Sequence, residues 1–131
     1  MPARYGIDTS ILVRLLTGDP EEGFNSVVRA LTSLIDDGAE VFASNQVIGE
    51  AYIALQHHYS VSRADAHLAL ATVLTSGLVT PQNGAGVITA IQTTTGCGLL
   101  DRLIANDYHR AEMVTLTLDR KMAALPDVRR L

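Results

Sequence analysis

Four acidic residues occupy positions where a carboxylate could do chemistry. Asp8 and Asp119 each follow a predicted strand and begin a predicted helix. Glu50 and Asp101 lie within predicted helices, among apolar neighbours. Strand-to-helix junctions are where α/β sheets place ligand-binding residues. Hard cations such as Mg²⁺ prefer carboxylate oxygens and keep several waters. Four such carboxylates brought together would therefore bind a divalent cation and suit the hydrolysis of phosphodiesters by a metal-activated water.

The two helical acids are singled out by the faces on which they lie. At about 100° per residue, Asp101 shares a helix face with Ile104 and Tyr108. Glu50 lies on an apolar stretch, with Ile53 on one side of it. A carboxylate on an apolar face must be neutralised, hydrogen-bonded or bound to a cation, because it loses hydration there. Both positions therefore favour a ligand-binding role.

Each acid also has a purely structural interpretation. Asp8 and Asp119 could be helix N-caps, a position that Asp favours. Glu50 could reach water from the edge of the apolar stripe, and Asp101 could pair with Arg102. The functional interpretation rests on the four acids together.

Further charged residues lie near these acids in the sequence. Asp107 could join the site as a fifth acid. Four basic residues could contact the phosphates of such a substrate, or equally could pair with the acids: Arg14, Arg102, Arg120 and Lys121.

The elements that must position these residues alternate between strands and helices. Strands are predicted at residues 4–7, 40–43, 78–80, 113–118 and, as an edge strand, 127–131. Helices are predicted at residues 9–17, 21–36, 46–59, 62–76, 83–95, 98–112 and 120–125. This alternation predicts an α/β fold, with a parallel sheet covered on both faces and a buried first strand. No repeat or linker divides the chain, so residues 1–131 are expected to form one domain.

Composition narrows the class of protein. The chain has 131 residues, of which 47% are hydrophobic and 18% charged, as in a globular domain. A net charge of −4 argues against a protein that coats nucleic acid, but not against a nucleic-acid enzyme. No apolar run approaches the length of about 18 residues that a membrane span needs. With the single Cys97, these features predict a cytoplasmic protein without a membrane partner.

The order and context of the acidic motifs resemble those of a known family. The motifs are Ile7-Asp8-Thr9-Ser10 after the first strand, Glu50 in a helix after the second, Asp101 in LLDRLIA, and Thr117-Leu118-Asp119-Arg120 after a late strand. They resemble PIN-domain ribonucleases, and most of all the VapC-type toxins of type II toxin–antitoxin pairs. The resemblance covers nearly the whole chain.

The resemblance carries several expectations. It implies a three-layer α/β/α fold with a central, mainly parallel sheet, and an endoribonuclease that depends on Mg²⁺ or Mn²⁺. It implies a homodimer and a small cognate antitoxin protein. Asp8, Glu50, Asp101 and Asp119 fall on the family's metal-binding and catalytic acids, and Thr117 falls on its site hydroxyl. Thr9 and Ser10 would support the site, although many members carry Asn where this chain has Ser10.

Two other functions remain open from the sequence. The first is an interaction module of the same fold whose acids are inert. The second is a phospho-receiver signalling domain, which needs an acidic pair after the first strand and a lysine after the last core strand. Only Asp8 stands at the first position, and Lys121 is the only lysine in the chain. The sequence therefore favours the nuclease.

Overall fold

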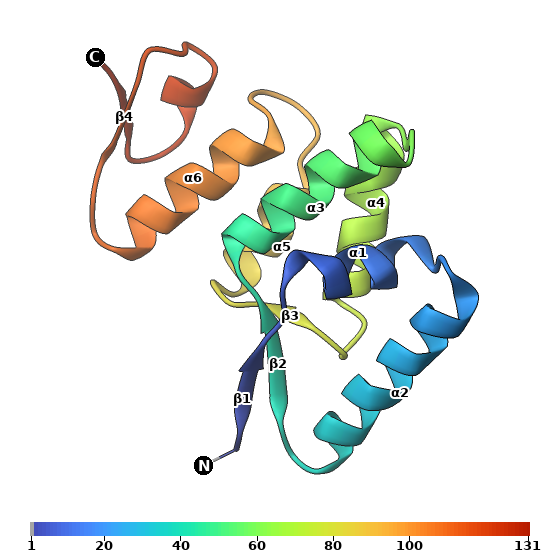
Figure 1. Ribbon diagram of the computed structural model, residues 1–131. Coiled ribbons are helices and arrows are strands. Elements are labelled where there is room, and N and C mark those ends of the chain that lie inside the picture. Colours follow the sequence, from blue (N-terminus) through green and yellow to red (C-terminus); the bar gives the residue numbers. More distant parts are fainter. Residues whose placement is uncertain (1) are drawn as a thin grey trace.

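The computed structural model describes residues 2–131, and its elements alternate between short strands and longer helices (Figure 1). Their order is β1 (Arg4–Gly6), α1 (Thr9–Thr17), α2 (Glu21–Asp36), β2 (Glu40–Ala43), α3 (Asn45–His58), α4 (Arg63–Leu74), β3 (Thr80–Pro81), α5 (Ala85–Gln92), α6 (Leu99–Arg110), β4 (Thr115–Thr117), the 3₁₀ helix η1 (Met122–Ala124) and β5 (Val128–Arg130). The chain is thus a mixed α/β protein, as predicted.

Local capping chemistry sets the limits of the early helices. Asp8 begins α1, because its side chain accepts a hydrogen bond from the Ile11 amide. Gly18, at φ +66°, ends the helix and donates its N–H to the Arg14 carbonyl. Ser44 and Ser62 cap α3 and α4 in the same way as Asp8 caps α1. The predicted limits of α1 are confirmed, and those of α2, α3 and α4 are correct to within two residues.

The first three strands form a parallel sheet in the order β1-β2-β3. In β2, Val41 and Ala43 turn one face of the sheet toward the core, where both are buried. The paired strand β1 contributes Ile7 to the same core, just beyond its last residue. The core is completed by large helical and loop side chains that are fully buried: Leu12, Ile48, Leu55, Leu70, Leu74, Val79, Val87, Ile91 and Leu99.

The last two strands do not join this sheet. Within residues 2–131, β4 and β5 pair in parallel only with each other, so the five strands form two sheets where the sequence predicted one. The chain turns away after α6 at Glu112, whose backbone is left-handed at φ +61°. Among residues 2–131 no strand pairs with the outer edge of β1, and the residues of β1 are exposed, contrary to the prediction of a buried strand.

Residues 113–131, here termed the C-terminal unit, pack on α6 instead (Figure 1). Met122 forms a small buried cluster with Cys97 and Ala105, the second of which lies on α6. His109 Nδ1 lies 2.9 Å from Asp127 Oδ2 across the same junction. The predicted helix at 120–125 is reduced to the single turn η1.

Among the helices of residues 2–131, none combines the length and the apolar character that crossing a membrane requires.

Candidate functional site

The turn from β1 into α1 carries the first acidic residue with two hydroxyl neighbours. Ser10 Oγ donates a hydrogen bond to Asp8 Oδ1 at 2.6 Å, and the Ile11 amide donates to the same oxygen at 3.2 Å. Asp8 and Ser10 are both exposed. Asp8 is therefore both the N-cap of α1 and an accessible, oriented carboxylate at the carboxyl end of a strand.

A second carboxylate is attached to this turn from a distant part of the chain. Thr9 Oγ1 donates a hydrogen bond to Glu50 Oε1 at 2.7 Å, because α3 packs against α1. Glu50 is exposed, so the prediction that it suffers a loss of hydration on an apolar face is wrong. The structure nevertheless links Glu50 to the turn of Asp8, because Thr9 directly follows Asp8 in this turn.

The hydrogen bonds at this turn also favour the ionised form of Asp8. The Ser10 hydroxyl has the largest effect and the Ile11 amide the next, and together they hold the pKa of Asp8 below its ordinary value. A depressed pKa contributes stability above the unfolded-state value of 3.8, and this contribution is lost as the pH falls through the folded-state pKa. Asp8 is thus an anion throughout the neutral range.

We expect Ser10→Ala to raise the pKa of Asp8 toward its ordinary value, because the substitution removes the strongest of these hydrogen bonds. Carbon-detected NMR titration of the Asp8 carboxyl group measures the shift. Ser10→Thr keeps the hydroxyl and is the matched control, with a pKa close to that of the wild type. Equal pKa values in the wild type and in Ser10→Ala would show that the hydroxyl does not act on Asp8 in solution.

Asp101 lies on α6, between Leu100 and Arg102. Leu100 and Leu103 of α6 lie against Gly49 of α3, and Ile104 lines the same side of the helix. Asp101 is half-buried beside this face, about 60° around the helix from Ile104. Within residues 2–131 it forms no group with two other acids that could hold a metal ion.

Asp119 lies in the C-terminal unit, where it forms a local cap. Its Oδ1 accepts a hydrogen bond from the Met122 amide at 2.8 Å, and its own amide donates to Thr117 Oγ1 at 3.0 Å. Within residues 2–131 the structure gathers no group of three or more His, Cys, Asp or Glu side chains that could hold a metal ion. The structure thus links Glu50 to the turn of Asp8 through Thr9 and places Asp119 in the C-terminal unit, and within residues 2–131 it does not gather the four predicted acids into one group.

A groove of about 310 Å³ lies beside Glu50, between α3 and α6. Ile53, Leu100 and Ile104 give it an apolar lining, and Asp107 adds a second acid. Asp107 Oδ1 accepts a hydrogen bond from Asn83 Nδ2 at 2.8 Å. Asp107, which the sequence suggested as a possible fifth acid, thus lines the same groove as Glu50.

A network of side-chain amides fixes this groove, and the sequence did not predict it. Asn45 Nδ2 donates to the Leu103 carbonyl and to Asn106 Oδ1, both at 2.9 Å, and Asn83 Nδ2 donates to the same Asn106 oxygen. These bonds attach α6 to α3 and to the segment before α5. No local pattern could have predicted them, because Asn45 and Asn106 are 61 residues apart in sequence.

The four basic candidates differ in their surroundings. Arg102 is held by the loop before α6, where its guanidinium donates to the carbonyls of Thr95 and Cys97. Arg14 is half-buried and lies against Gly23. Arg120 and Lys121 are exposed in the C-terminal unit. Only these last two present freely accessible charge.

Comparison with protein-family models, with curated proteins and with solved structures gives no match for this chain. The site is therefore interpreted from its own geometry.

Proposed function

We propose that the protein is a divalent-metal-dependent endoribonuclease of PIN type, and that its centre is the turn carrying Asp8 together with Glu50 of α3, which Thr9 of this turn holds by a hydrogen bond. The observation that carries the proposal is the 2.7 Å hydrogen bond from Thr9 to Glu50, since it links a strand-end acid to a helix acid more than 40 residues away. A simple N-cap would need only Asp8. The additional attachment of Glu50 is better explained by a site.

The chemistry of this turn suits a phosphodiester and a hard cation. Asp8 and Glu50 offer carboxylate oxygens, the ligand type that Mg²⁺ and Mn²⁺ prefer. Ser10 orients Asp8 and keeps it ionised, and Thr9 orients Glu50. Both acids are exposed, so a large substrate such as RNA could reach them.

We further propose that the protein is the toxin of a toxin–antitoxin pair and has the three-layer α/β/α fold. It would form a homodimer in the cytoplasm and bind a small cognate antitoxin. Support for a protein partner comes from α6, where Leu100, Ile104 and Tyr108 form an exposed apolar stripe along one side of the helix. Contiguous apolar surface of this kind marks interaction sites.

The direct test is cleavage of a mixed cellular RNA pool by the purified protein. We expect cutting with Mg²⁺ or Mn²⁺, loss of cutting with EDTA, and recovery when excess metal is restored. Mapping the cut ends would identify the target. Cleavage that continues unchanged in EDTA would contradict the proposed metal dependence.

An inert module of the same fold is the second candidate. The observation in its favour is that, in residues 2–131, one chain does not gather a third acid beside Asp8 and Glu50. Calorimetric titration separates the two candidates, because an inert module should not bind Mg²⁺ or Mn²⁺ at millimolar concentration.

A further inference from the structure

The outer edge of β1 presents backbone groups in a fixed alternation. Ile7 donates its amide to the Phe42 carbonyl, and Ala3 accepts from the Glu40 amide, so odd-numbered residues of β1 face β2. The amides and carbonyls of Arg4 and Gly6 therefore point away from β2. Within residues 2–131 no strand lies on that side. Such an edge is a template for another strand.

The strand β4 presents a matching edge. Thr115 donates its amide to the Asp127 carbonyl, and Thr117 accepts from the Leu131 amide, so these two residues face β5. The backbone groups of residues 114, 116 and 118 point away from β5. Both β1 and β4 are three residues long, and each already forms a parallel pair on its other side.

One face of β4 is also apolar and uncovered. Leu116 of β4 is 59% exposed, and Val114 and Leu118, which flank the strand at the alternate positions, are 57% and 76% exposed. A parallel sheet is normally buried on both faces. A two-stranded parallel sheet with three large aliphatic side chains in water is therefore an incomplete structure.

The two edges can pair when the outward-facing residues of β1 lie opposite the residues of β4 that face β5. If Gly6 lies opposite Thr117, the outward groups of Gly6 meet those of Leu116 and Leu118, and the outward groups of Arg4 meet those of Leu116 and residue 114. The same register places Leu116 beside Tyr5. The apolar face of β4 then continues the face of β1 and β2 that carries Ile7 and the buried core side chains of β2. Backbone and side-chain alternation thus agree independently.

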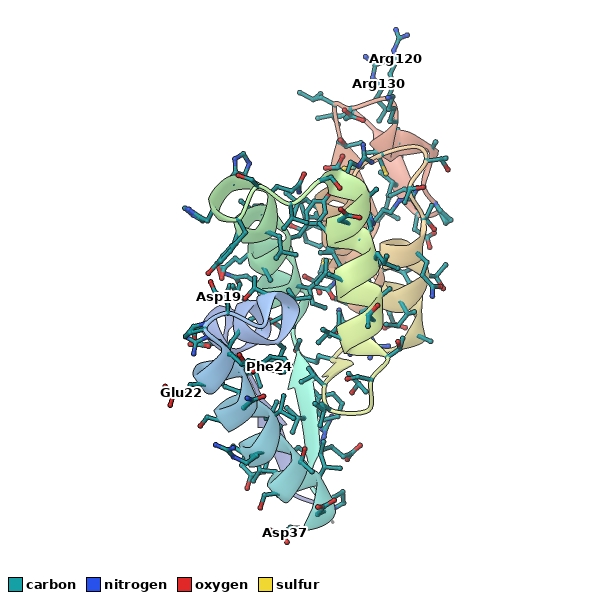
Figure 2. All side chains as sticks on the ribbon, turned by 90° about the vertical axis from the view of Figure 1, so that its right-hand side faces the viewer. Asp19, Glu22, Phe24, Asp37, Arg120 and Arg130 are labelled. Atoms are coloured by element: carbon teal, nitrogen blue, oxygen red, sulfur yellow. The ribbon has the colours of Figure 1, made fainter. Side chains whose placement is uncertain are left out.

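The net charges of the two parts are opposite in sign. Residues 113–131 carry four basic and two acidic side chains, a formal +2, whereas residues 1–112 carry six basic and twelve acidic, a formal −6. Arg120 and Arg130 project from one end of the molecule (Figure 2). In the register described above, Arg120 would lie just beyond the carboxyl end of the other copy's β1, near Asp8, and opposite charges promote association.

We propose that two copies of this chain pair through these edges, so that β4 of each copy extends the sheet of the other at β1. A second copy is the indicated occupant because each C-terminal unit is held on its own α6 by the Met122 cluster and the His109–Asp127 contact. In that position its apolar face stays exposed and does not cover its own β1. Each copy carries one β1 edge and one β4 edge, so a two-fold symmetric dimer would form two β1–β4 pairs and leave neither edge unpaired.

The pairing has a consequence that rests on the proposed function. Parallel strands end at the same edge of a sheet. The register that sets Gly6 opposite Thr117 also sets Asp8 opposite the partner's Asp119. Asp119, which one chain leaves apart from Asp8, would then come from the second copy, with the neighbouring Arg120 and Lys121.

Disulfide trapping tests the pairing directly. One copy carries Tyr5→Cys and a second, differently tagged copy carries Leu116→Cys, with the buried Cys97 unchanged in both. Mild oxidation of the mixture should give a cross-linked species of about 28 kDa before the tags are counted, twice the 14.0 kDa chain. The matched control replaces Leu116→Cys by Thr117→Cys, which lies on the opposite face of β4 and should not link. No link, or equal linking in both mixtures, would overturn the proposal.

The double variant Tyr5→Cys/Leu116→Cys in a single chain distinguishes pairing between copies from closure within one chain. Pairing between copies gives a dimer on a non-reducing gel. A monomer with an internal disulfide would mean that β4 returns to its own β1, and would overturn the proposal. None of these readouts requires RNA cleavage, so a trapped dimer without nuclease activity would remove the proposed function alone.

Backbone substitution at the edge of β1 provides a second measurement. Gly6→Pro removes an amide that points away from β2, so the β1–β2 pairing is retained. We expect a dimer mass for the wild type and for Gly6→Ala, whose added methyl group meets nothing within 4 Å, and a monomer mass for Gly6→Pro. Light scattering coupled to gel filtration measures all three. A monomeric wild type, or a dimeric Gly6→Pro with the wild-type circular dichroism spectrum, would overturn the proposal.

Discussion

Asp8→Asn should reduce RNA cleavage by about 100-fold or more while the protein remains folded. Loss of groups that only support a metal ligand typically costs 10–100-fold, and Asp8 is proposed to act directly. The amide of Asn can still cap α1, because Asn and Asp are about equally good N-caps. The cleavage rate on a fixed RNA, with Mg²⁺ or Mn²⁺, gives the ratio, and thermal unfolding confirms that the fold is retained.

Asp37→Asn provides the matched control for Asp8→Asn. It makes the same change in charge at an exposed acid that points away from the body of the molecule (Figure 2). Its cleavage rate should equal that of the wild type. An Asp8→Asn protein that cuts at the wild-type rate would place the reaction elsewhere, and the proposed centre would have to be abandoned.

Leu12→Ala should lower the free energy of unfolding by about 3 kcal/mol, within the range of 2–5 kcal/mol for buried Leu-to-Ala changes. Leu12 is fully buried and attaches α1, which carries the site turn at its start, to the core. The melting temperature should fall by roughly 10 °C. Leu68→Ala is the control, because Leu68 is 66% exposed and should cost less than about 0.5 kcal/mol.

Measuring cleavage by Leu12→Ala well below its melting temperature shows how the helix serves the site. We expect near-normal activity there, because the Asp8 and Glu50 contacts do not involve the Leu12 side chain. A stability of Leu12→Ala equal to that of the wild type would contradict the described packing of α1.

Helices were predicted better than sheets, and the physical reason is the range of the interactions. The start of α1 depends on Asp8 and the Ile11 amide, and its end depends on Gly18, all of them neighbours in sequence. Strand pairing depends on residues far apart. The run at 113–118 has the composition of a strand, and β4 forms within it, but nothing local indicates that β5 is its one partner among residues 2–131.

The same distinction applies to the site. The sequence correctly placed Asp8 and Asp119 at junctions between a strand and a helical turn, because caps are local. The attachment of Glu50 to Thr9 spans 41 residues and depends on how α3 packs on α1, which no spacing rule encodes. For Asp101 the helix that carries it was predictable, but the packing of that helix on α3 was not.

The free edge of β1 would make the protein sensitive to its own abundance. If only another molecule fills the edge, the paired fraction follows mass action. Well below the dissociation constant, halving the total amount of protein would reduce the number of pairs by about fourfold. A site that needs Asp119 from the partner would then remain silent at a low copy number. The rate of synthesis of the chain would thus set a threshold for its activity.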